Sequence, residues 1–163
     1  MKLGLAIEQV ASAERELAER LLAVGERHRT DHDVHHLTRT LARMERGHID
    51  ALARHAARYG VELDRGSDDG SPLRPVAKAA REKGAELLGR RPEPGLLLLR
   101  DLRELHLLAS GASLDWVALG QGAQAAKDPR LLETVTECHE ETLRTLKWTT
   151  YRLKEAAPQV LTG

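Results

Sequence analysis

The chain has 163 residues, enough to bury a sizeable hydrophobic core in one domain without help from disulfides or metal ions. Its 25 Lys and Arg residues balance its 25 Asp and Glu residues, and this neutrality argues against electrostatic binding to nucleic acid or to a membrane surface. Leu and Ala dominate the apolar residues, Val and Ile are few, and Phe is absent, which excludes a β-rich fold. We therefore expect an all-α protein with one domain, residues 1–163.

The cysteine content and the apolar pattern bear on the cellular compartment. Cys138 is the single cysteine, so a disulfide framework is excluded, and a lone thiol suits the reducing cytosol. No apolar run reaches the length that spans a membrane, and Glu8 interrupts the first apolar stretch too early for a secretory signal. These features predict a cytoplasmic protein whose partners include neither nucleic acid nor a membrane.

Two helices are expected in the first part of the chain. The first runs from about Leu3 to His28, because its apolar residues recur at the spacing of a helix. The segment Thr30–Asp33 carries short oxygen-bearing side chains that cap a helix, and the second helix is expected to follow it as far as Tyr59. Gly60 then supplies the left-handed conformation that commonly ends a helix.

A long connection separates these helices from the rest of the chain. Residues 64–71 have the composition of a solvated loop, a short helix is expected from Ser71 to Gly89, and residues 90–95 interrupt the chain again. A connection of about 35 residues can cross the full length of a helical bundle and restart the chain at the opposite end. A plain up-down-up-down bundle would not require this length.

Two longer helices are expected in the second part of the chain. Asp128 and Pro129 predict the start of the last helix, and Pro158 predicts its end. The chain is thus expected to form a four-helix bundle of two antiparallel hairpins, with a short helix in the long connection between the second and third helices. The predicted stripe of the third helix comprises Leu98, Leu102, Leu105, Ala109, Ala112, Trp116, Leu119 and Ala123, and that of the fourth comprises Leu132, Val135, His139, Thr142, Leu146, Thr149 and Leu153.

Polar residues interrupt three of the predicted buried stripes. Glu14 lies on the stripe of the first helix, Glu45 and His48 on that of the second, and His139 on that of the fourth. A buried carboxylate is costly unless it is paired or binds a metal ion. Glu14 precedes the first turn by about as many residues as Glu45 follows it, so the two carboxylates are expected at the same height. Glu45 and His48 are three residues apart and face the same way.

These residues resemble a known ligand pattern. The segment Met44–Leu52 resembles the Glu-x-x-His segment of ferritin-like proteins, and Ala13–Leu17 resembles their first ligand segment. The layout of nearly the whole chain is similar to that of the small bacterial stress-associated ferritin-like proteins. The resemblance implies a ferritin-like bundle with a carboxylate-bridged pair of iron or manganese ions in its core. It also implies a role in iron handling or in the oxidative-stress response.

The third and fourth predicted helices of this chain depart from the family's ligand pattern. The fourth helix should carry another Glu-x-x-His, but Thr136 stands three residues before His139, and the middle of the third helix has no acid. Asp115 and Glu104 are the nearest acids on that helix and are the weaker candidates. The site is therefore expected to be reduced or mononuclear and to hold Fe, Mn or Zn. Its candidate ligands are Glu14, Glu45, His48 and His139.

Two functions of different classes follow from this incomplete ligand set. A redox-active ion with an open coordination position would support an oxidoreductase of the ferroxidase type, which oxidises Fe(II) or removes peroxide. Alternatively, the polar groups hydrogen-bond one another without any metal, and the bundle is an interaction or structural module with a vestigial site. The missing acid of the third helix favours the module, and the level positions of Glu14, Glu45 and His48 favour the metal.

Small and apolar residues of the third helix predict close helix packing. Gly111, Gly120 and Gly122 each cost up to about 1 kcal/mol in a helix interior, and the close approach of another helix, within the bundle or across a dimer interface, would offset this cost. The run Leu96–Leu99 is apolar on all sides, which points to self-association or to burial under the short connecting helix. We therefore expect a homodimer.

Four histidines gather at the first turn of the chain. We interpret them as exposed imidazoles at a helix end, which aid solubility or bind zinc adventitiously. His32 and His36 are four residues apart, a spacing that can also hold a metal ion on a helix surface. The four residues are His28, His32, His35 and His36.

Overall fold

The computed structural model describes residues 2–64 and 93–163, and within these ranges the chain is almost entirely helical. No strand occurs in the two ranges, so the all-α prediction is confirmed. The predicted short helix from Ser71 to Gly89 lies outside the described residues. No helix in the described ranges is both long enough and apolar enough to cross a membrane. The elements are α1 (Leu3–Arg27), α2 (His32–Ala56), the short 3-10 helix η1 (Ala57–Tyr59), α4 (Pro94–Ala125) and α5 (Pro129–Thr162).

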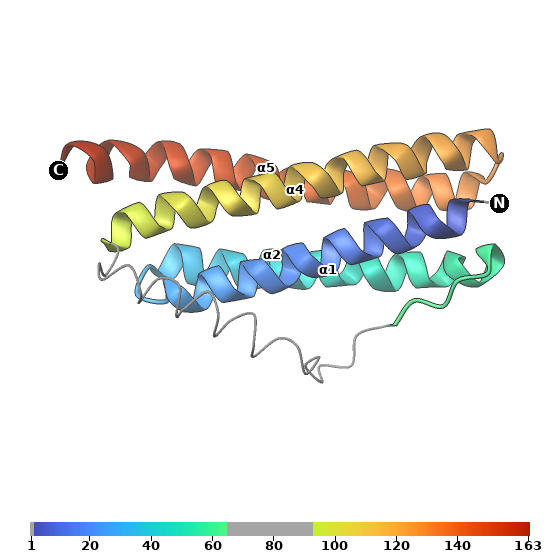
Figure 1. The fold of residues 1–163 in the computed structure, drawn as a ribbon, viewed down its shortest axis with the longest axis horizontal. Helices are drawn as coiled ribbons and strands as arrows, with labels where there is room; N and C mark the ends of the chain where they lie inside the picture. Colours follow the sequence, from blue (N-terminus) through green and yellow to red (C-terminus); the bar gives the residue numbers. More distant parts are fainter. Residues whose placement is uncertain (1, 65–92) are drawn as a thin grey trace.

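The four α-helices pack side by side as two antiparallel hairpins, α1 with α2 and α4 with α5 (Figure 1). α1 also packs along α4, whereas α2 and α5 contact each other more sparsely. α2 ends beside the turn between α4 and α5, where the Tyr59 hydroxyl donates to Asp128 Oδ2 (2.5 Å). α4 begins at the other end of the bundle, where His28 Nε2 donates to Asp101 Oδ2 (2.7 Å). The chain therefore restarts at the opposite end, as the length of the connection predicts.

Side-chain caps and a glycine set the ends of the helices where the sequence predicts them. The Asp31 carboxylate accepts a hydrogen bond from Val34 N (3.1 Å) at the start of α2. Asp128 accepts one from Leu131 N (3.0 Å) at the start of α5. Gly60 has a φ of 72° directly after η1, a left-handed conformation that glycine adopts without strain.

The prediction that Pro158 ends the last helix is wrong. α5 continues to Thr162, with the proline exposed inside the helix. Proline lacks an N–H group, but its carbonyl still accepts a hydrogen bond from Thr162 Oγ1 (2.6 Å). Val160 packs against Gly95 of α4, where a Cβ atom would lie 2.8 Å from Val160 Cγ2. This contact holds the last turn of α5 on the bundle.

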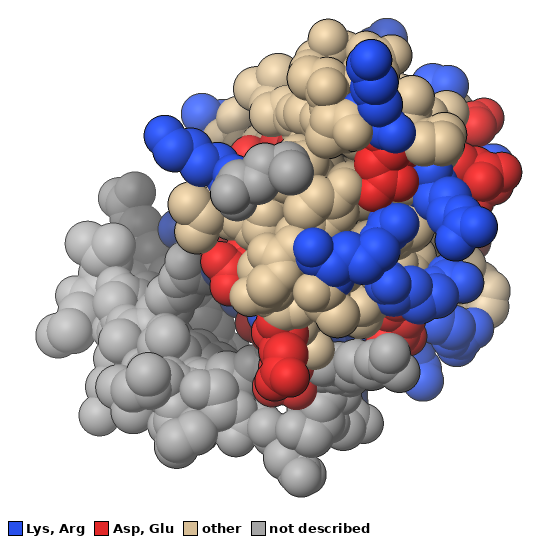
Figure 2. Space-filling view, turned by 90° about the vertical axis from the view of Figure 1, so that its right-hand side faces the viewer, with Lys and Arg blue, Asp and Glu red and all other residues tan. Residues whose placement is uncertain are grey.

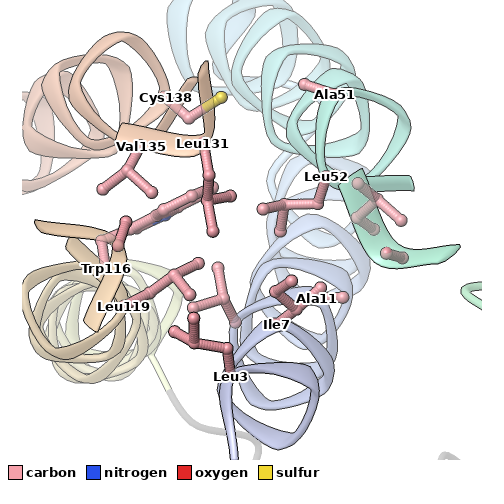
Figure 3. Close-up of a cluster of buried hydrophobic side chains, with 14 residues drawn as sticks. Leu3, Ile7, Ala11, Ala51, Leu52, Trp116, Leu119, Leu131, Val135 and Cys138 are labelled. Atoms are coloured by element: carbon pink, nitrogen blue, oxygen red, sulfur yellow. The ribbon is translucent and has the colours of Figure 1, made fainter. Parts of the chain in front are cut away.

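Two hydrophobic clusters fill the core on either side of a polar layer. In the cluster of Figure 3, Trp116 and Leu119 of α4 converge with Ile7 of α1 and Leu131 of α5. The second cluster lies toward the other end of the bundle and includes Leu105 of α4 together with leucines of α1 and α2. Every residue of the predicted α4 stripe is buried in one of the two clusters or beside them, so this stripe is confirmed.

The buried face of α5 agrees with the prediction at three of the seven positions and is turned slightly away from it at the others. Cys138 and Thr145 are buried, whereas His139 and Leu146, one residue further along, are half-buried. Neighbouring residues of a helix point about 100° apart, so such a shift changes which side chains enter the core. Threonine can be buried when its hydroxyl is hydrogen-bonded, and apolar spacing alone therefore does not fix the face.

The close packing predicted for the glycines of α4 occurs at two of three positions. A Cβ atom on Gly122 would lie 2.6 Å from Leu3 Cδ2, and one on Gly120 would lie 3.2 Å from Val135 Cγ1. A Cβ atom on Gly111 would have no described atom within 4 Å. Packing within the bundle thus explains Gly120 and Gly122 and leaves Gly111 at the surface.

Charged side chains of both signs are interspersed at the end of the bundle where α4 turns into α5, with Lys and Arg gathered on one side (Figure 2). Arg58 pairs with Asp128 there (3.0 Å) and lies over the ring of Tyr59, 5.8 Å from its centroid. These contacts tie η1 to the start of α5.

Candidate metal centre

Three buried side chains of the first hairpin meet between the two hydrophobic clusters. Glu14 of α1 and Glu45 of α2 are 0% exposed, and His48 of α2 is 2% exposed. His48 Nδ1 lies 3.1 Å from Glu14 Oε2 and 3.2 Å from Glu45 Oε2. One ligand atom from each residue lies within 4.8 Å of the other two, a spacing that allows all three to share one metal ion. We call these three residues the Glu-Glu-His cluster.

The geometry of the first hairpin explains why these residues meet. α1 and α2 are antiparallel and joined by a short turn, so Glu14 and Glu45 lie at the same height, as predicted. Glu45 and His48 are three residues apart and project from one face of α2. The predicted meeting of these three residues is therefore confirmed.

Helices α4 and α5 supply hydrogen-bond donors to the same cluster. Trp116 Nε1 donates to Glu14 Oε1 (2.5 Å), and Thr142 Oγ1 donates to the same oxygen (2.8 Å). Thr145 Oγ1 donates to Glu45 Oε1 (2.7 Å). Periodicity placed Trp116 and Thr142 among packing residues and gave no sign of Thr145. The three-residue spacing of Thr142 and Thr145 is the available signal in the sequence, because it repeats on α5 the Glu-x-x-His spacing of α2.

The three groups of the cluster have displaced pKa values because they share protons in a space closed to water. Burial raises the pKa of Glu14, but hydrogen bonds from His48, Glu45 and Trp116 outweigh it and hold this pKa below its ordinary value. Burial and the neighbouring Glu14 charge raise the pKa of Glu45 to about 7. Burial lowers the pKa of His48, but the hydrogen bonds and charges of both carboxylates outweigh it and raise the value to about 9. At neutral pH the cluster therefore contains an ionised Glu14 and a protonated His48.

One nitrogen atom of the Glu-Glu-His cluster lacks a hydrogen-bond partner among the described residues. This atom is His48 Nε2, which is buried. The nearest carboxylate oxygen, Glu141 Oε1, is 3.8 Å away, which is too far for a hydrogen bond. Trp116 packs edge-on against the imidazole with the ring centroids 5.9 Å apart. A buried nitrogen without a partner is costly, and a bound water, or a metal ion once this nitrogen has lost its proton, would remove that cost.

The other predicted ligands lie outside the Glu-Glu-His cluster. His139 is half-buried and faces α4, where its Nε2 hydrogen-bonds with Ser113 Oγ (2.7 Å), and burial lowers its pKa. Asp115 and Glu104 make polar contacts with α1, at 3.3 Å and 3.0 Å respectively. The structure therefore does not bring His139, Asp115 or Glu104 to the cluster, and the rotated face of α5 explains this for His139.

The ligand atoms of the cluster fit one metal ion and do not fit two. Two carboxylates and one imidazole are ligands that Zn, Fe and Mn accept in proteins. At this layer α4 and α5 contribute the hydrogen-bond donors Trp116, Thr142 and Thr145. Among the described residues of these two helices, the one carboxylate near the cluster is the partly exposed Glu141, 3.8 Å from His48 Nε2, and it is not part of the group that can share an ion. The carboxylate-bridged pair of ions implied by the ferritin-like resemblance therefore does not fit the described residues.

A second polar cluster, missed in the sequence, joins α1 to α4 around the buried Asp101. Arg27 Nη1 donates to both carboxylate oxygens of Asp101 (2.9 and 3.0 Å), and His28 Nε2 donates to one of them (2.7 Å). His28 is buried, so the expectation of an exposed imidazole at this position is wrong. Asp101 neighbours Leu102 on a stripe that otherwise reads as apolar, and no spacing rule singles it out. The cluster fixes the start of α4 against the end of α1.

No family model matches the chain, and no curated protein or solved structure is significantly similar to it. The likeness to ferritin-like proteins consequently rests on the ligand segments and the helix order alone. Function is therefore inferred from the Glu-Glu-His cluster and its surroundings.

Proposed function

We propose that this chain is a ferritin-like protein that binds one divalent metal ion through Glu14, Glu45 and His48. The main support is the convergence of these three buried side chains within 4.8 Å. Two carboxylates are seldom buried side by side unless they are paired or bind a metal ion. The unpartnered His48 Nε2 supports a bound group that the protein's own hydrogen bonds do not replace. The proposed setting, from the resemblance, is iron handling or the oxidative-stress response.

The proposed chemistry is that of a ferroxidase-like oxidoreductase. A redox-active Fe or Mn ion would supply oxidation of Fe(II) or reduction of peroxide at this position. Donors from α4 and α5 hold the Oε1 atom of each carboxylate, and both Oε2 atoms face His48. Thr142 Oγ1 makes a longer hydrogen bond to Glu45 Oε2 (3.3 Å). His48 carries an extra proton at neutral pH that must leave before the imidazole binds a cation. Metal binding is therefore expected to release protons and to strengthen as the pH rises.

A metal-free interaction or structural module is the second candidate. The observation that favours it is the internal satisfaction of the cluster, because Glu14 accepts hydrogen bonds from His48, Trp116 and Thr142. The charge of the imidazolium then balances that of the carboxylate without an ion. In this case the cluster serves only to define how the two hairpins pack together.

Elemental analysis of the untagged chain, purified without chelator, decides between the two candidates. The analysis is repeated after incubation with Fe(II), Mn(II) or Zn(II) and removal of free ions. We expect about one equivalent of metal per chain. Occupancy should fall by roughly tenfold or more in Glu45→Gln and in Glu14→Ala/His48→Ala. His139→Ala is the matched control, because it removes a nearby histidine outside the cluster and should retain the metal.

Circular dichroism establishes that each variant is folded before its metal content is compared. Glu45→Gln preserves the size of the side chain, so it remains informative even where the double variant does not fold. Metal near zero in the folded native chain with all three ions would overturn the metal proposal and favour the module. An equal loss of metal in His139→Ala would show that the ligands are wrongly assigned.

A further inference from the structure

The outer surface of α4 carries apolar side chains that the bundle does not cover. Leu107, Leu114 and Val117 are 53%, 70% and 47% exposed. Gly111 lies between them, and a Cβ atom there would meet no described atom within 4 Å. These four residues follow one another at steps of three or four, so they share one side of the helix, opposite the buried stripe. We call them the outer face of α4.

Hydrogen bonds between α4 and α5 fix which residues of α5 lie beside the outer face. His106 Nδ1 bonds with Thr149 Oγ1 (2.9 Å), and Ser113 Oγ bonds with His139 Nε2 (2.7 Å). The two helices are antiparallel, so the middle of the outer face lies level with Leu143 of α5. Leu143 is itself exposed and extends the apolar surface onto the second helix.

One line of exposed charges on α5 changes sign at the same level. Glu133 and Glu140 precede Leu143, whereas Lys147 and Lys154 follow it, and all four side chains are exposed. They are spaced seven residues apart, which places them in one line along the helix. Within the described ranges none of the four forms an ion pair. This line of charges is therefore acidic on one side of Leu143 and basic on the other.

We propose that this surface binds a second copy of the chain, with each helix antiparallel to its own copy. A two-fold axis level with Gly111 and Leu143, and at right angles to the helices, reverses both helix directions while keeping α4 opposite α4 and α5 opposite α5. The midpoint between Leu107 and Leu114 lies on this axis. Leu107 consequently meets Leu114 of the partner subunit, and the outer faces cover each other.

The same axis brings opposite charges together along α5. Glu140 and Lys147 are equally far from the axis, so Glu140 meets Lys147 of the partner subunit. Glu133 meets Lys154 of the partner subunit in the same way, and symmetry forms each pair twice. An apolar face and a charge pattern that are both self-complementary about one axis fit a second copy better than an unrelated partner.

The available surface is large enough for a stable dimer. α4 has 32 residues and α5 has 34, so each helix is about 50 Å long and about 10 Å wide. Side by side they present roughly 1,000 Å², against about 800 Å² per partner in an interface of standard size.

Two charge-reversal variants test this arrangement. Glu133→Lys/Glu140→Lys makes the line of charges on α5 wholly basic, and Lys147→Glu/Lys154→Glu makes it wholly acidic. Each variant alone should raise the dimer dissociation constant by roughly tenfold or more, because like charges then face each other. An equimolar mixture of the two should dimerise at least as tightly as the native chain, since every contact then joins opposite charges. Sedimentation equilibrium measures all three cases.

The outer face has its own variant and a matched control. Leu114→Glu should abolish the dimer, whereas Leu5→Glu, which alters an equally exposed leucine of α1, should leave it intact. The native chain is expected to sediment at twice its 18.1 kDa mass. A native chain that stays monomeric at a concentration on the order of 100 µM would overturn the proposal. A mixture no tighter than its separate components would also overturn it.

Discussion

Glu14 and Glu45 are identical side chains in one buried cluster, yet their pKa values move in opposite directions. Burial raises both values, but Glu14 receives hydrogen bonds from His48, Glu45 and Trp116, which favour its ionised form. Glu45 faces the charge of Glu14, and its pKa rises to about 7. Two adjacent carboxylates carry one negative charge more easily than two, so a proton occupies the cluster at neutral pH.

The stability of the metal-free protein should therefore fall in alkaline solution. The pKa of His48 rises from 6.5 to about 9 in the folded chain, so its proton stabilises the fold fully below pH 6.5, and this contribution is lost as the pH passes through 9. One pKa unit corresponds to about 1.4 kcal/mol, which sets an upper limit of about 3–4 kcal/mol on the loss. Urea denaturation in EDTA across this pH range measures it.

The variant Glu45→Gln separates the contributions to this pH dependence. It removes one of the two carboxylates that hold the proton on His48, so the curve should become flatter. It also removes a carboxyl whose raised pKa costs stability as the pH rises from 4.5 to about 7. A native chain with the same free energy of unfolding at both ends of the range would contradict the displaced His48 pKa.

The indole of Trp116 is expected to matter for its N–H group as well as for its size. Trp116→Phe leaves Glu14 with one donor fewer in a buried site, which should lower the free energy of unfolding by about 1–3 kcal/mol, in addition to any packing loss. Trp148→Phe, at a half-buried position, is the matched control. Chemical denaturation followed by circular dichroism compares the two, and equal losses would count against the hydrogen bond to Glu14.

At the scale of elements, Asp31 joins two helices that are far apart in the sequence. It caps α2 through Val34 N, and it pairs with Arg152 of α5 (2.5 Å). Asp31→Ala removes both interactions and should cost about 1–2 kcal/mol, whereas Asp31→Asn keeps a capping side chain and should cost less. Thermal denaturation ranks the two variants, and a smaller loss in Asp31→Ala would reverse the expected order.

The helix ends that the sequence predicts are those set by nearby residues. Asp31, Asp128 and Gly60 act on backbone groups within a few positions of themselves, so their roles can be read without knowing the fold. Pro158 fails as a stop signal because a distant contact, between Val160 and Gly95, keeps the next turn in place. Local rules cannot include such a contact.

The same distinction separates the predicted part of the site from the missed part. Glu14, Glu45 and His48 belong to one hairpin with a short turn, so helix geometry alone brings them together. Thr145 enters the cluster because the buried face of α5 is turned slightly away from its most apolar side. Asp101 is buried because Arg27 and His28 of another helix meet it, which no pattern on α4 signals.

At the scale of the whole molecule, a metal ion in the Glu-Glu-His cluster should stabilise the entire bundle, because the ligands meet only in the folded chain. At a free ion concentration of about 100 times Kd, linkage adds about 2.7 kcal/mol, or roughly 5–10 °C in Tm for a chain of this size. Thermal denaturation with Mn(II) or Zn(II) measures this shift, and EDTA should reverse it. Glu45→Gln should show little of the shift, and an equal shift in both proteins would place the ion elsewhere.

The reactivity of the single cysteine can report transient opening of the helical bundle. Cys138 is buried beside the core of Figure 3, and burial, together with the charges of Glu14 and Glu141, raises its pKa to about 12. Such a thiol reacts with an alkylating reagent only while α5 transiently separates from the bundle. The alkylation rate of Cys138 in the native chain therefore measures how often these openings occur. A cation that offsets the charge of Glu14 would by itself lower the pKa of Cys138 and speed alkylation, so slower alkylation on adding an ion would record fewer openings of the core.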